Sequence, residues 1–165
     1  MAFQKHHGLA ADGISGRNTT ALLNQPLPHV QGKASQGDLI EVDKAKQVLY
    51  IVRGGVAAWA INTSTGTGAE FTEFSEKEQR EITGTSVTPE GEFRVNRERP
   101  DGWWTGELGD LYRPKYFRGG IAVHGSNNIP NYPASHGCVR VSTPAMDFIW
   151  AANLMPLGMP VWVHS

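Results

Sequence analysis

The sequence predicts a mainly β protein with one main helix and a short helical fragment at its N-terminus. Runs of β-branched and aromatic residues such as Val48–Val52 alternate with tight turns such as Gly54-Gly55, which indicates an antiparallel meander. Only the segment from Ser142 to Leu154 shows a sustained helical pattern. The length of 165 residues fits one domain, or one domain with a small appendage.

The composition excludes several classes of protein. With 39% hydrophobic and 19% charged residues, the chain is of the ordinary globular kind and is neither disordered nor fibrous. Its 15 Lys and Arg residues against 16 Asp and Glu give a formal charge of −1, so we expect no nucleic-acid partner. No stretch approaches the roughly 20 apolar residues that span a bilayer, so we expect no transmembrane segment.

The N-terminal residues differ from the rest of the chain. Gly8 and the Asp12-Gly13 pair form turns ahead of a short helix at Thr19–Leu23, which Pro26 ends. Met1–Lys5 lacks the apolar region of a signal peptide. We therefore expect an N-terminal fragment over residues 1–28, a linker over 29–37 and a main domain over 38–165.

The main domain is expected to consist of short strands. The runs of β-forming residues that predict them are Leu39–Val42, Val48–Val52, Val56–Ile61, Gly91–Asn96, Ile121–His124 and Pro160–His164.

The one main helix has a clear start and a clear apolar face. Ser142 supplies a cap and Pro144 lies in the first turn. An apolar face expected to pack in the core follows at helical spacing, and Pro156 and Gly158 are expected to end the helix. The residues of this face are Met146, Ile149, Trp150 and Leu154.

The stretch from Gly66 to Trp104 is polar and contains an acidic insert over residues 66–86. We interpret it as a solvated loop or helix face, although its length also suits a flap over a site. Trp103 and Trp104 are either core residues or the lining of a groove for sugar or peptide.

The candidate catalytic residues lie close in the sequence to the single cysteine, Cys138. A free cysteine is more often an inert buried thiol, but catalysis by a thiol needs a base and donors for an oxyanion. His124 ends a short apolar strand and His136 lies two residues before the cysteine, so either imidazole is a candidate base. Gly137 allows close approach of the backbone to a bound carbonyl, and Arg140 adds a positive charge for a substrate carboxylate. A zinc site built from the two histidines and the cysteine is an alternative, although the spacing matches no common zinc motif.

Local charge agrees with a carboxylate-binding site. Between Leu111 and Met146 the charged residues are all basic, which predicts attraction of carboxylates, although solubility alone explains part of this pattern. These residues are Arg113, Lys115, Arg118 and Arg140.

Four ordered motifs carry a family resemblance. The run S-H-G-C-V-R-V, preceded by I-A-V-H-G, resembles the active-site signature of the L,D-transpeptidase (YkuD-type) catalytic domain. Thr88–Phe93, Tyr116–Gly120 and Gly158–Val163 resemble further motifs of the same family. The resemblance covers residues 38–165 and implies a β-sandwich-type catalytic domain.

The N-terminal fragment resembles the second half of a peptidoglycan-binding module. Turn and helix positions of that module match Gln4, Gly8, Leu9, Asp12, Gly13, Gly16, Thr19, Ala21 and Leu22. This implies glycan as a candidate partner of residues 1–28, with a helical appendage packed on the main domain as the alternative.

The first resemblance also implies residue roles. Cys138 is the expected nucleophile and His124 its base, with the carbonyl of Gly125 orienting the imidazole. Backbone N–H groups of His136, Gly137 and Cys138 are expected to bind the oxyanion. The expected substrate-binding residues are Ser126, Asn127, Tyr132, Ser135 and Arg140. No cofactor and no metal are expected.

The implied activity is acyl transfer on peptidoglycan stem peptides. A Cys138 thioester formed from a tetrapeptide stem would pass to an amine and give a 3→3 cross-link. With water as acceptor the protein would be an L,D-carboxypeptidase, and without turnover it would be a cell-wall-binding protein. Carbapenem-type lactams are expected to acylate the same thiol. The resemblance implies an extracytoplasmic, secreted protein of the bacterial cell envelope, with its leader absent from this sequence.

Overall fold

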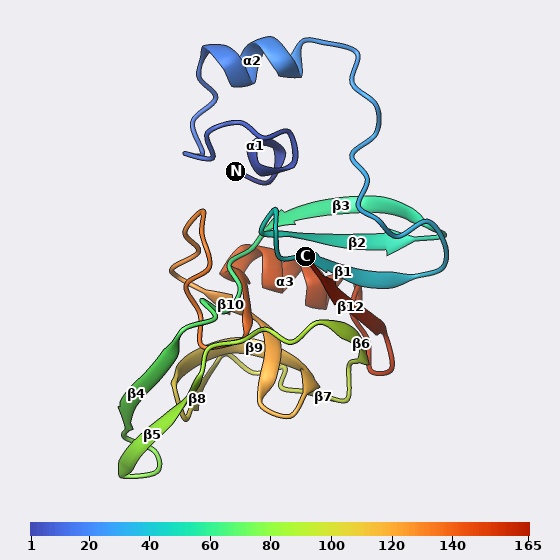
Figure 1. Ribbon diagram of the computed structural model, residues 1–165. Coiled ribbons are helices and arrows are strands. Elements are labelled where there is room, and N and C mark those ends of the chain that lie inside the picture. Colours follow the sequence, from blue (N-terminus) through green and yellow to red (C-terminus); the bar gives the residue numbers. More distant parts are fainter.

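The computed structural model describes all 165 residues as two packed sheets, a separate hairpin and three helices (Figure 1). Sheet A has the order β3-β2-β1-β12-β6 and sheet B the order β11-β10-β9-β7, with β8 also paired to β9. The strands of sheet A are β1 (Leu39–Asp43), β2 (Val48–Arg53), β3 (Val56–Asn62), β6 (Gly91–Arg94) and β12 (Pro160–His164). Those of sheet B are β7 (Arg97–Glu98), β8 (Trp103–Gly106), β9 (Gly109–Arg118), β10 (Ile121–Ser126) and β11 (Val139–Ser142).

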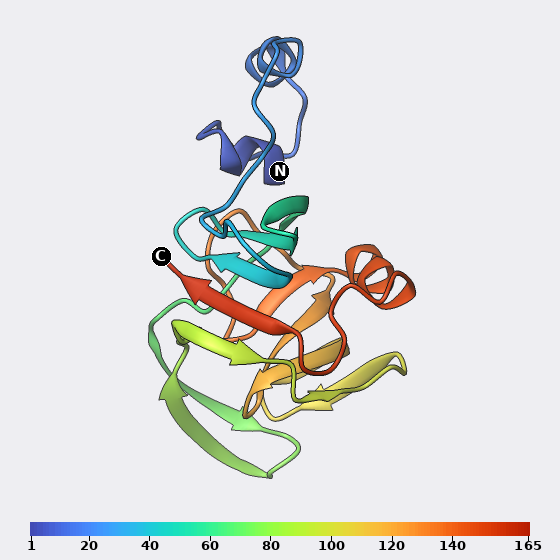
Figure 2. The ribbon, with the colours of Figure 1, turned by 90° about the vertical axis from the view of Figure 1, so that its right-hand side faces the viewer.

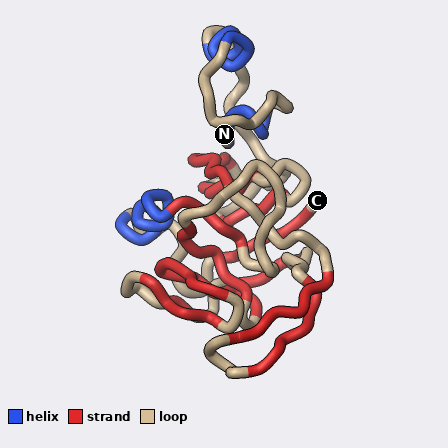
Figure 3. Tube along the Cα trace, turned by 90° about the vertical axis from the view of Figure 1, so that its left-hand side faces the viewer, coloured by secondary structure: helices blue, strands red, loops and turns tan.

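The remaining elements lie outside the two sheets. The hairpin is β4 (Glu70–Ser75) and β5 (Arg80–Thr85), and the helices are α1 (Ala2–His6), α2 (Arg17–Leu23) and α3 (Thr143–Ala151). Strands dominate the main domain, as the tube coloured by secondary structure shows (Figure 3). The mainly β prediction and the antiparallel meander β1-β2-β3 are confirmed. None of the helices has the length and apolar character of a membrane-spanning segment.

The acidic insert is a β-hairpin rather than a loop or helix face. Strands β4 and β5 pair in register from Glu70 opposite Thr85 to Ser75 opposite Arg80. The hairpin projects from the end of the molecule that lies opposite the N-terminal fragment (Figures 1 and 2).

The hydrophobic core lies between the sheets and under α3. Fifteen buried residues form it, including Ile40 and Val161 of sheet A, Val123 and Val141 of sheet B, and Ile149 of α3. Side chains alternate between the two faces of a strand, so the immediate neighbours of the buried valines in sheet B point to the opposite face. That opposite face carries the candidate site.

Helix α3 begins as predicted but ends earlier. The Ser142 hydroxyl accepts a hydrogen bond from the Ala145 N–H at 3.3 Å, which confirms the cap. Asn153 adopts a left-handed conformation with φ of 48°, and the Leu154 N–H donates back to the Ile149 carbonyl. Asn153 therefore ends the helix ahead of Pro156 and Gly158, and Leu154 reaches the core from beyond the last turn.

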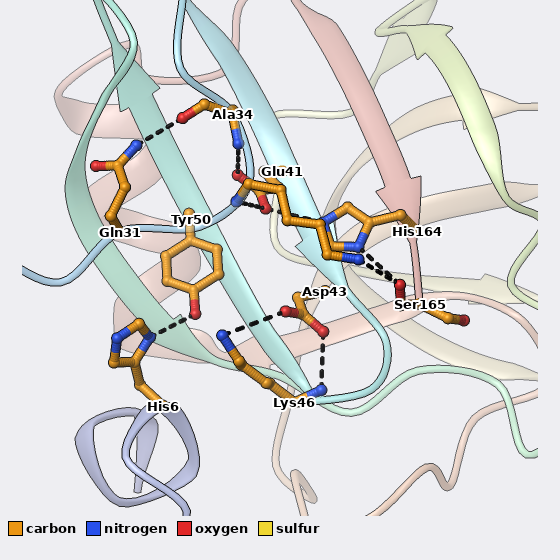
Figure 4. A network of polar contacts seen from close by, with 10 residues as sticks. His6, Gln31, Ala34, Glu41, Asp43, Lys46, Tyr50, His164 and Ser165 are labelled. Carbon is orange, nitrogen blue, oxygen red and sulfur yellow. Dashed lines mark hydrogen bonds and ion pairs between the residues drawn. The ribbon is translucent and has the colours of Figure 1, made fainter.

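The predicted linker, residues 29–37, lies against the outer face of sheet A. The carboxylate of Glu41 is fully buried there and accepts the backbone N–H groups of Lys33 and Ala34 at 2.7 and 3.0 Å. Its Oε1 also lies 2.8 Å from Nε2 of His164 (Figure 4). One buried acid therefore attaches this segment to strand β1 and to the C-terminal strand.

We expect Glu41→Gln to destabilise the protein by about 2 kcal/mol, because the amide nitrogen would replace one of two acceptor oxygens facing backbone N–H groups. Urea denaturation followed by circular dichroism measures the change. The matched control is Glu92→Gln on β6, whose side chain is exposed and forms no hydrogen bond or ion pair. Equal midpoints for the two variants would contradict the role of Glu41.

Helix α1 packs on strands β2 and β3. The buried ammonium of Lys5 donates to the carbonyls of Gln47 and Thr63 at 3.1 and 2.8 Å, and burial lowers the pKa of Lys5 to about 8. Nδ1 of His6 lies 2.8 Å from the Tyr50 hydroxyl (Figure 4). Helix α2, which has no buried residue, lies farther out (Figure 1).

Candidate active site

The face of sheet B opposite the core carries the residues predicted for catalysis. Val123 and Val139 point into the core, and their neighbours His124, Cys138 and Arg140 line a cavity of about 450 Å³. Strands β10 and β11 run parallel with His124 opposite Arg140, so His124 and Cys138 lie diagonally on one face. Ser135 and His136 line the same cavity. His124 thus meets the segment Ser135–Arg140, which begins eleven positions later in the sequence, at one site.

The imidazole of His124 is buried and its orientation is fixed. Nδ1 lies 2.8 Å from the Gly125 carbonyl, the contact that the family resemblance implies. A carbonyl only accepts hydrogen bonds, so Nδ1 carries the proton and Nε2 keeps a free lone pair. Burial lowers the pKa of His124 to about 4; the Gly125 contact opposes this shift and the Arg140 charge adds to it. His124 is therefore neutral at physiological pH and able to accept a proton.

Gly125 has no room for a side chain. A Cβ atom at this position would lie 2.8 Å from Cδ1 and 3.0 Å from Cβ of Tyr112, and 3.3 Å from Cβ of Met146. Glycine therefore lets β10 pass close to β9 and α3 while its carbonyl holds the imidazole.

The Cys138 thiol lies at the turn before β11 and is partly exposed. Its Sγ donates to the Gly120 carbonyl at 3.7 Å, and it forms no hydrogen bond with His124 in this resting arrangement. Desolvation raises the pKa of the thiol, although the Ala122 backbone and the Arg140 charge oppose the shift. The resting pair is therefore a neutral thiol beside a neutral imidazole, and proton transfer must accompany attack.

The oxyanion donors differ in part from the expectation. The Gly137 N–H is already donated to the Ser135 hydroxyl at 3.1 Å, so it is not free to bind an oxyanion. The N–H groups of His136 and Cys138 have no acceptor in the protein, so these two remain candidates. Gly137 has φ of 127°, and a Cβ there would lie 2.8 Å from the Val87 carbonyl, so its role is to shape the turn.

Ser135 builds the turn rather than facing substrate. Its hydroxyl donates to the Cys138 carbonyl at 2.5 Å and is 2% exposed as a residue. Thr88, from the motif Thr88–Phe93, donates to the Gly137 carbonyl at 2.7 Å. Two hydroxyl groups thus hold the backbone on both sides of the cysteine.

A strip of buried residues after β3 supports the same turn, and the sequence reasoning missed it. The Thr63 hydroxyl donates to the Arg140 carbonyl at 2.6 Å, and Ser64 exchanges two backbone hydrogen bonds with Arg140. The Thr65 carbonyl accepts the N–H groups of Ala134 and Ser135. The polar run N-T-S-T-G directly after a strand was the available signal.

The basic segment predicted from local charge does not surround the site. Lys115 points to the core side and pairs with Glu98 at 2.6 Å, and Arg113 pairs with Asp147 of α3 at 2.6 Å. Arg118 is exposed beside Phe93. Of the four basic residues only Arg140 lines the cavity, because alternation along β9 sends the others elsewhere.

Three predicted substrate-binding residues lie outside the cavity lining. Ser126 forms a local turn, with its hydroxyl accepting the Asn128 N–H at 3.1 Å. Asn127 is exposed, and Tyr132 is 60% exposed. Their loop extends toward the N-terminal fragment, where the Asn131 amide donates to the Ala11 carbonyl at 3.1 Å.

The hairpin β4–β5 forms one wall of the site. Oε1 of Glu73 lies 2.9 Å from Nε2 of His136, and the Phe71 ring lies 4.9 Å from the His136 ring. Lys77, at the hairpin tip, lines the cavity. Because His136 is directed at the hairpin, the two histidines and Cys138 do not gather as metal ligands.

The opposite wall contains residues that were not assigned to the site from the sequence. Arg97 and Arg99 of the β7 region line the cavity with Trp104 of β8 and Tyr116 of β9. The Arg97 guanidinium lies 3.9 Å from the centre of the Tyr116 ring, and that of Arg99 lies 3.6 Å from the centre of the Trp104 ring. Arg97 and Arg99 are two positions apart in an extended segment, which places both side chains on one face of that segment. That spacing was the sequence signal that could have assigned them to the site. Trp104 is thus a groove residue, one of the two roles considered for it.

Comparison with known proteins agrees with this arrangement. The family model described as the L,D-transpeptidase catalytic domain, YkuD, matches residues 37–163. An L,D-transpeptidase from Xylanimonas cellulosilytica is 44% identical over 99% of this chain and 77% of its own, with a TM-score of 0.86. One from Stackebrandtia nassauensis is 19% identical over 99% and 74%, with a TM-score of 0.62. An LD-transpeptidase solved in complex with imipenem is 15% identical over 78% and 59%, with a TM-score of 0.56. No curated protein sequence matches the chain.

Proposed function

Because the chain belongs to the YkuD family of L,D-transpeptidase catalytic domains, we propose that Cys138 is the nucleophile of this L,D-transpeptidase and His124 its base. One observation carries the assignment. His124 and Cys138 share one face of two adjacent parallel strands in a single cavity, and the Gly125 carbonyl leaves Nε2 of His124 free. The fixed tautomer and orientation of the His124 imidazole support its assignment as the base.

Acylation of the thiol is the first half of the cycle. Cys138 attacks the carbonyl of the third residue in a tetrapeptide stem while Nε2 of His124 takes the thiol proton. The N–H groups of Cys138 and His136 stabilise the tetrahedral oxyanion. Its collapse breaks the peptide bond, His124 passes the proton to the leaving amine, and terminal D-alanine departs. The product is a thioester on Cys138.

Transfer to an amine is the second half. The side-chain amine of a diamino acid on a neighbouring stem attacks the thioester, and His124 accepts its proton. The thiolate leaves and recovers that proton, which yields a 3→3 cross-link. Water in place of the amine would give L,D-carboxypeptidase activity through the same groups.

The experiment that tests the assignment is intact mass spectrometry of the protein incubated separately with a carbapenem and with a tetrapeptide stem. We expect a covalent lactam adduct, and dimeric muropeptide from the stem. Adding a free amine distinguishes the acceptors, because a hydrolase would continue to release tripeptide. Absence of any adduct or product would favour a non-catalytic wall-binding protein. The imipenem complex of the 15% identical relative supports the choice of probe.

The N-terminal fragment is proposed as a glycan contact. Gln4 holds its turn together through its amide, which donates to Asp12 at 2.7 Å and accepts the Gly13 N–H at 2.9 Å. All three residues match the peptidoglycan-binding pattern, and no residue of α2 is buried. Peptidoglycan lies outside the cytoplasm. The peptidoglycan-related activity of the family and the proposed glycan contact therefore support an extracytoplasmic, secreted protein of the cell envelope.

A further inference from the structure

We propose that Arg97 and Arg99 form a carboxylate-binding subsite that selects donor stems by charge. The preferred donor carries a free carboxylate, one not used in the peptide chain, on the residue before the one that is attacked, and the same stem with this group amidated is a poor donor. The inference rests on the proposed function, because it concerns the donor that Cys138 attacks.

Both guanidinium groups are held in place without being neutralised. Each lies over an aromatic ring of the cavity wall, Tyr116 for Arg97 and Trp104 for Arg99. Arg97 also donates to the Gly119 carbonyl at 3.3 Å. Neither arginine lies within 4.0 Å of a carboxylate, so most of their N–H donors remain available.

The acid nearest in the sequence cannot neutralise them. Glu98 lies between the two arginines, but strand alternation directs it to the other face, where it pairs with buried Lys115 at 2.6 Å. The cavity lining as a whole contains four cations, Lys77, Arg97, Arg99 and Arg140, against two carboxylates, Glu107 of the β8–β9 turn and Asp110 at the start of β9. One of these, Asp110, accepts a hydrogen bond from Thr105 at 2.9 Å. The empty cavity therefore has excess positive charge.

Sheet register places this charge at a defined distance from the thiol. Arg97 pairs with Tyr116 and Tyr116 with Ala122, and Ala122 and Cys138 directly precede the paired residues Val123 and Val139 of β10 and β11. Three strand steps of about 4.8 Å give about 14 Å between the Arg97 and Cys138 backbones. The departing D-alanine carboxylate lies only one residue from the attacked carbonyl, which suits the nearer Arg140. The long side chain of Arg97 reaches back toward the carboxylate on the preceding residue, whose side chain extends it about two residue lengths of about 3.5 Å from the attacked carbonyl.

Chemistry favours a carboxylate over an amide at this position. Guanidinium groups donate paired hydrogen bonds to a carboxylate, and such charge-assisted bonds are about twice as strong as neutral ones. An amide offers one acceptor oxygen and places an N–H₂ donor against a guanidinium that has no acceptor. Amidation therefore removes one charge-assisted hydrogen bond and places two hydrogen-bond donors against each other.

Two synthetic tetrapeptide donors that differ only in this group, free acid or amide, test the proposal. We expect the free acid to be used about tenfold better in kcat/KM, mostly through KM, with a preference that falls as salt increases. Arg97→Gln together with Arg99→Gln should reduce the ratio to about twofold or less. The control Arg94→Gln removes one charge from exposed β6, outside the cavity lining, and should keep the preference.

Calorimetric binding of both donors to the Cys138→Ala protein supplies a readout that needs no turnover. A stronger affinity for the free acid that disappears in the double arginine variant supports the subsite. Equal affinity for the two donors, or equal kcat/KM in a protein that does form the lactam adduct, overturns the subsite and leaves the proposed function intact. Failure of every acylation overturns the proposed function, and the calorimetric comparison still decides the subsite.

Discussion

Cys138→Ala should abolish both lactam adduct formation and dimer formation from tetrapeptide stems, with a loss of at least about 10⁴-fold. The reason is that covalent transfer has no second thiol to use, since this chain has one cysteine and it shares the cavity with His124. The Ser135 hydroxyl is already engaged, because it donates to the Cys138 carbonyl. Intact mass and chromatography of the products measure both outcomes.

Folding is not expected to account for this loss. Cys138 precedes β11, and the turn around it is held by Ser135, Thr88 and the strip after β3, none of which bonds to the thiol. Near-ultraviolet circular dichroism and the denaturation midpoint should therefore match those of the original protein within about 1 kcal/mol. Dimer formation at an unchanged rate by a folded Cys138→Ala protein would contradict the transpeptidase mechanism.

Much of the fold could be predicted because sheet A obeys simple rules. β1, β2, β3 and β12 are apolar runs bounded by turn residues, and they form where the sequence indicated. The ten-residue strand β9 was missed because its pattern is irregular. It contains Pro114, a positive φ at Arg113 and a buried lysine, Lys115, whose charge is paired with Glu98. A strand whose two faces serve an active site and an ion pair does not show polar and apolar alternation.

The site also contains residues that the sequence predicts and residues that it does not. His124, His136 and Cys138 lie in contiguous motifs, so the sequence alone indicated them. Supporting and recognition residues such as Thr63 and Arg97 come from segments about 40 to 75 positions away and reach the site through strand register. Only the folded sheet brings such residues together, because no local spacing encodes a cross-strand neighbour.

His124→Ala should lower the rate of lactam acylation by about 10³-fold and change the shape of its pH dependence. In the original protein the burial that lowers the pKa of His124 to about 4 keeps the imidazole neutral above that pH, and burial also raises the pKa of the Cys138 thiol. The reactive neutral pair therefore dominates from about pH 5 to above pH 8, and the rate should be nearly flat over that range. Below about pH 4 the imidazole is protonated and the rate should fall.

Without His124 only the thiolate can attack, so the residual rate should rise about tenfold per pH unit through neutrality. Stopped-flow acylation by a carbapenem at each pH, with circular dichroism to show that the protein stays folded, measures both profiles. His136→Ala is the informative comparison, because the His136 ring faces Glu73 of the hairpin and its loss should leave the flat profile in place. An acid limb near pH 6.5 in the original protein would mean that the base is a solvated imidazole and not the buried His124. A flat profile that survives in His124→Ala would assign the proton transfer to another group, and Gly125 would then serve only the close packing of β10 against β9 and α3.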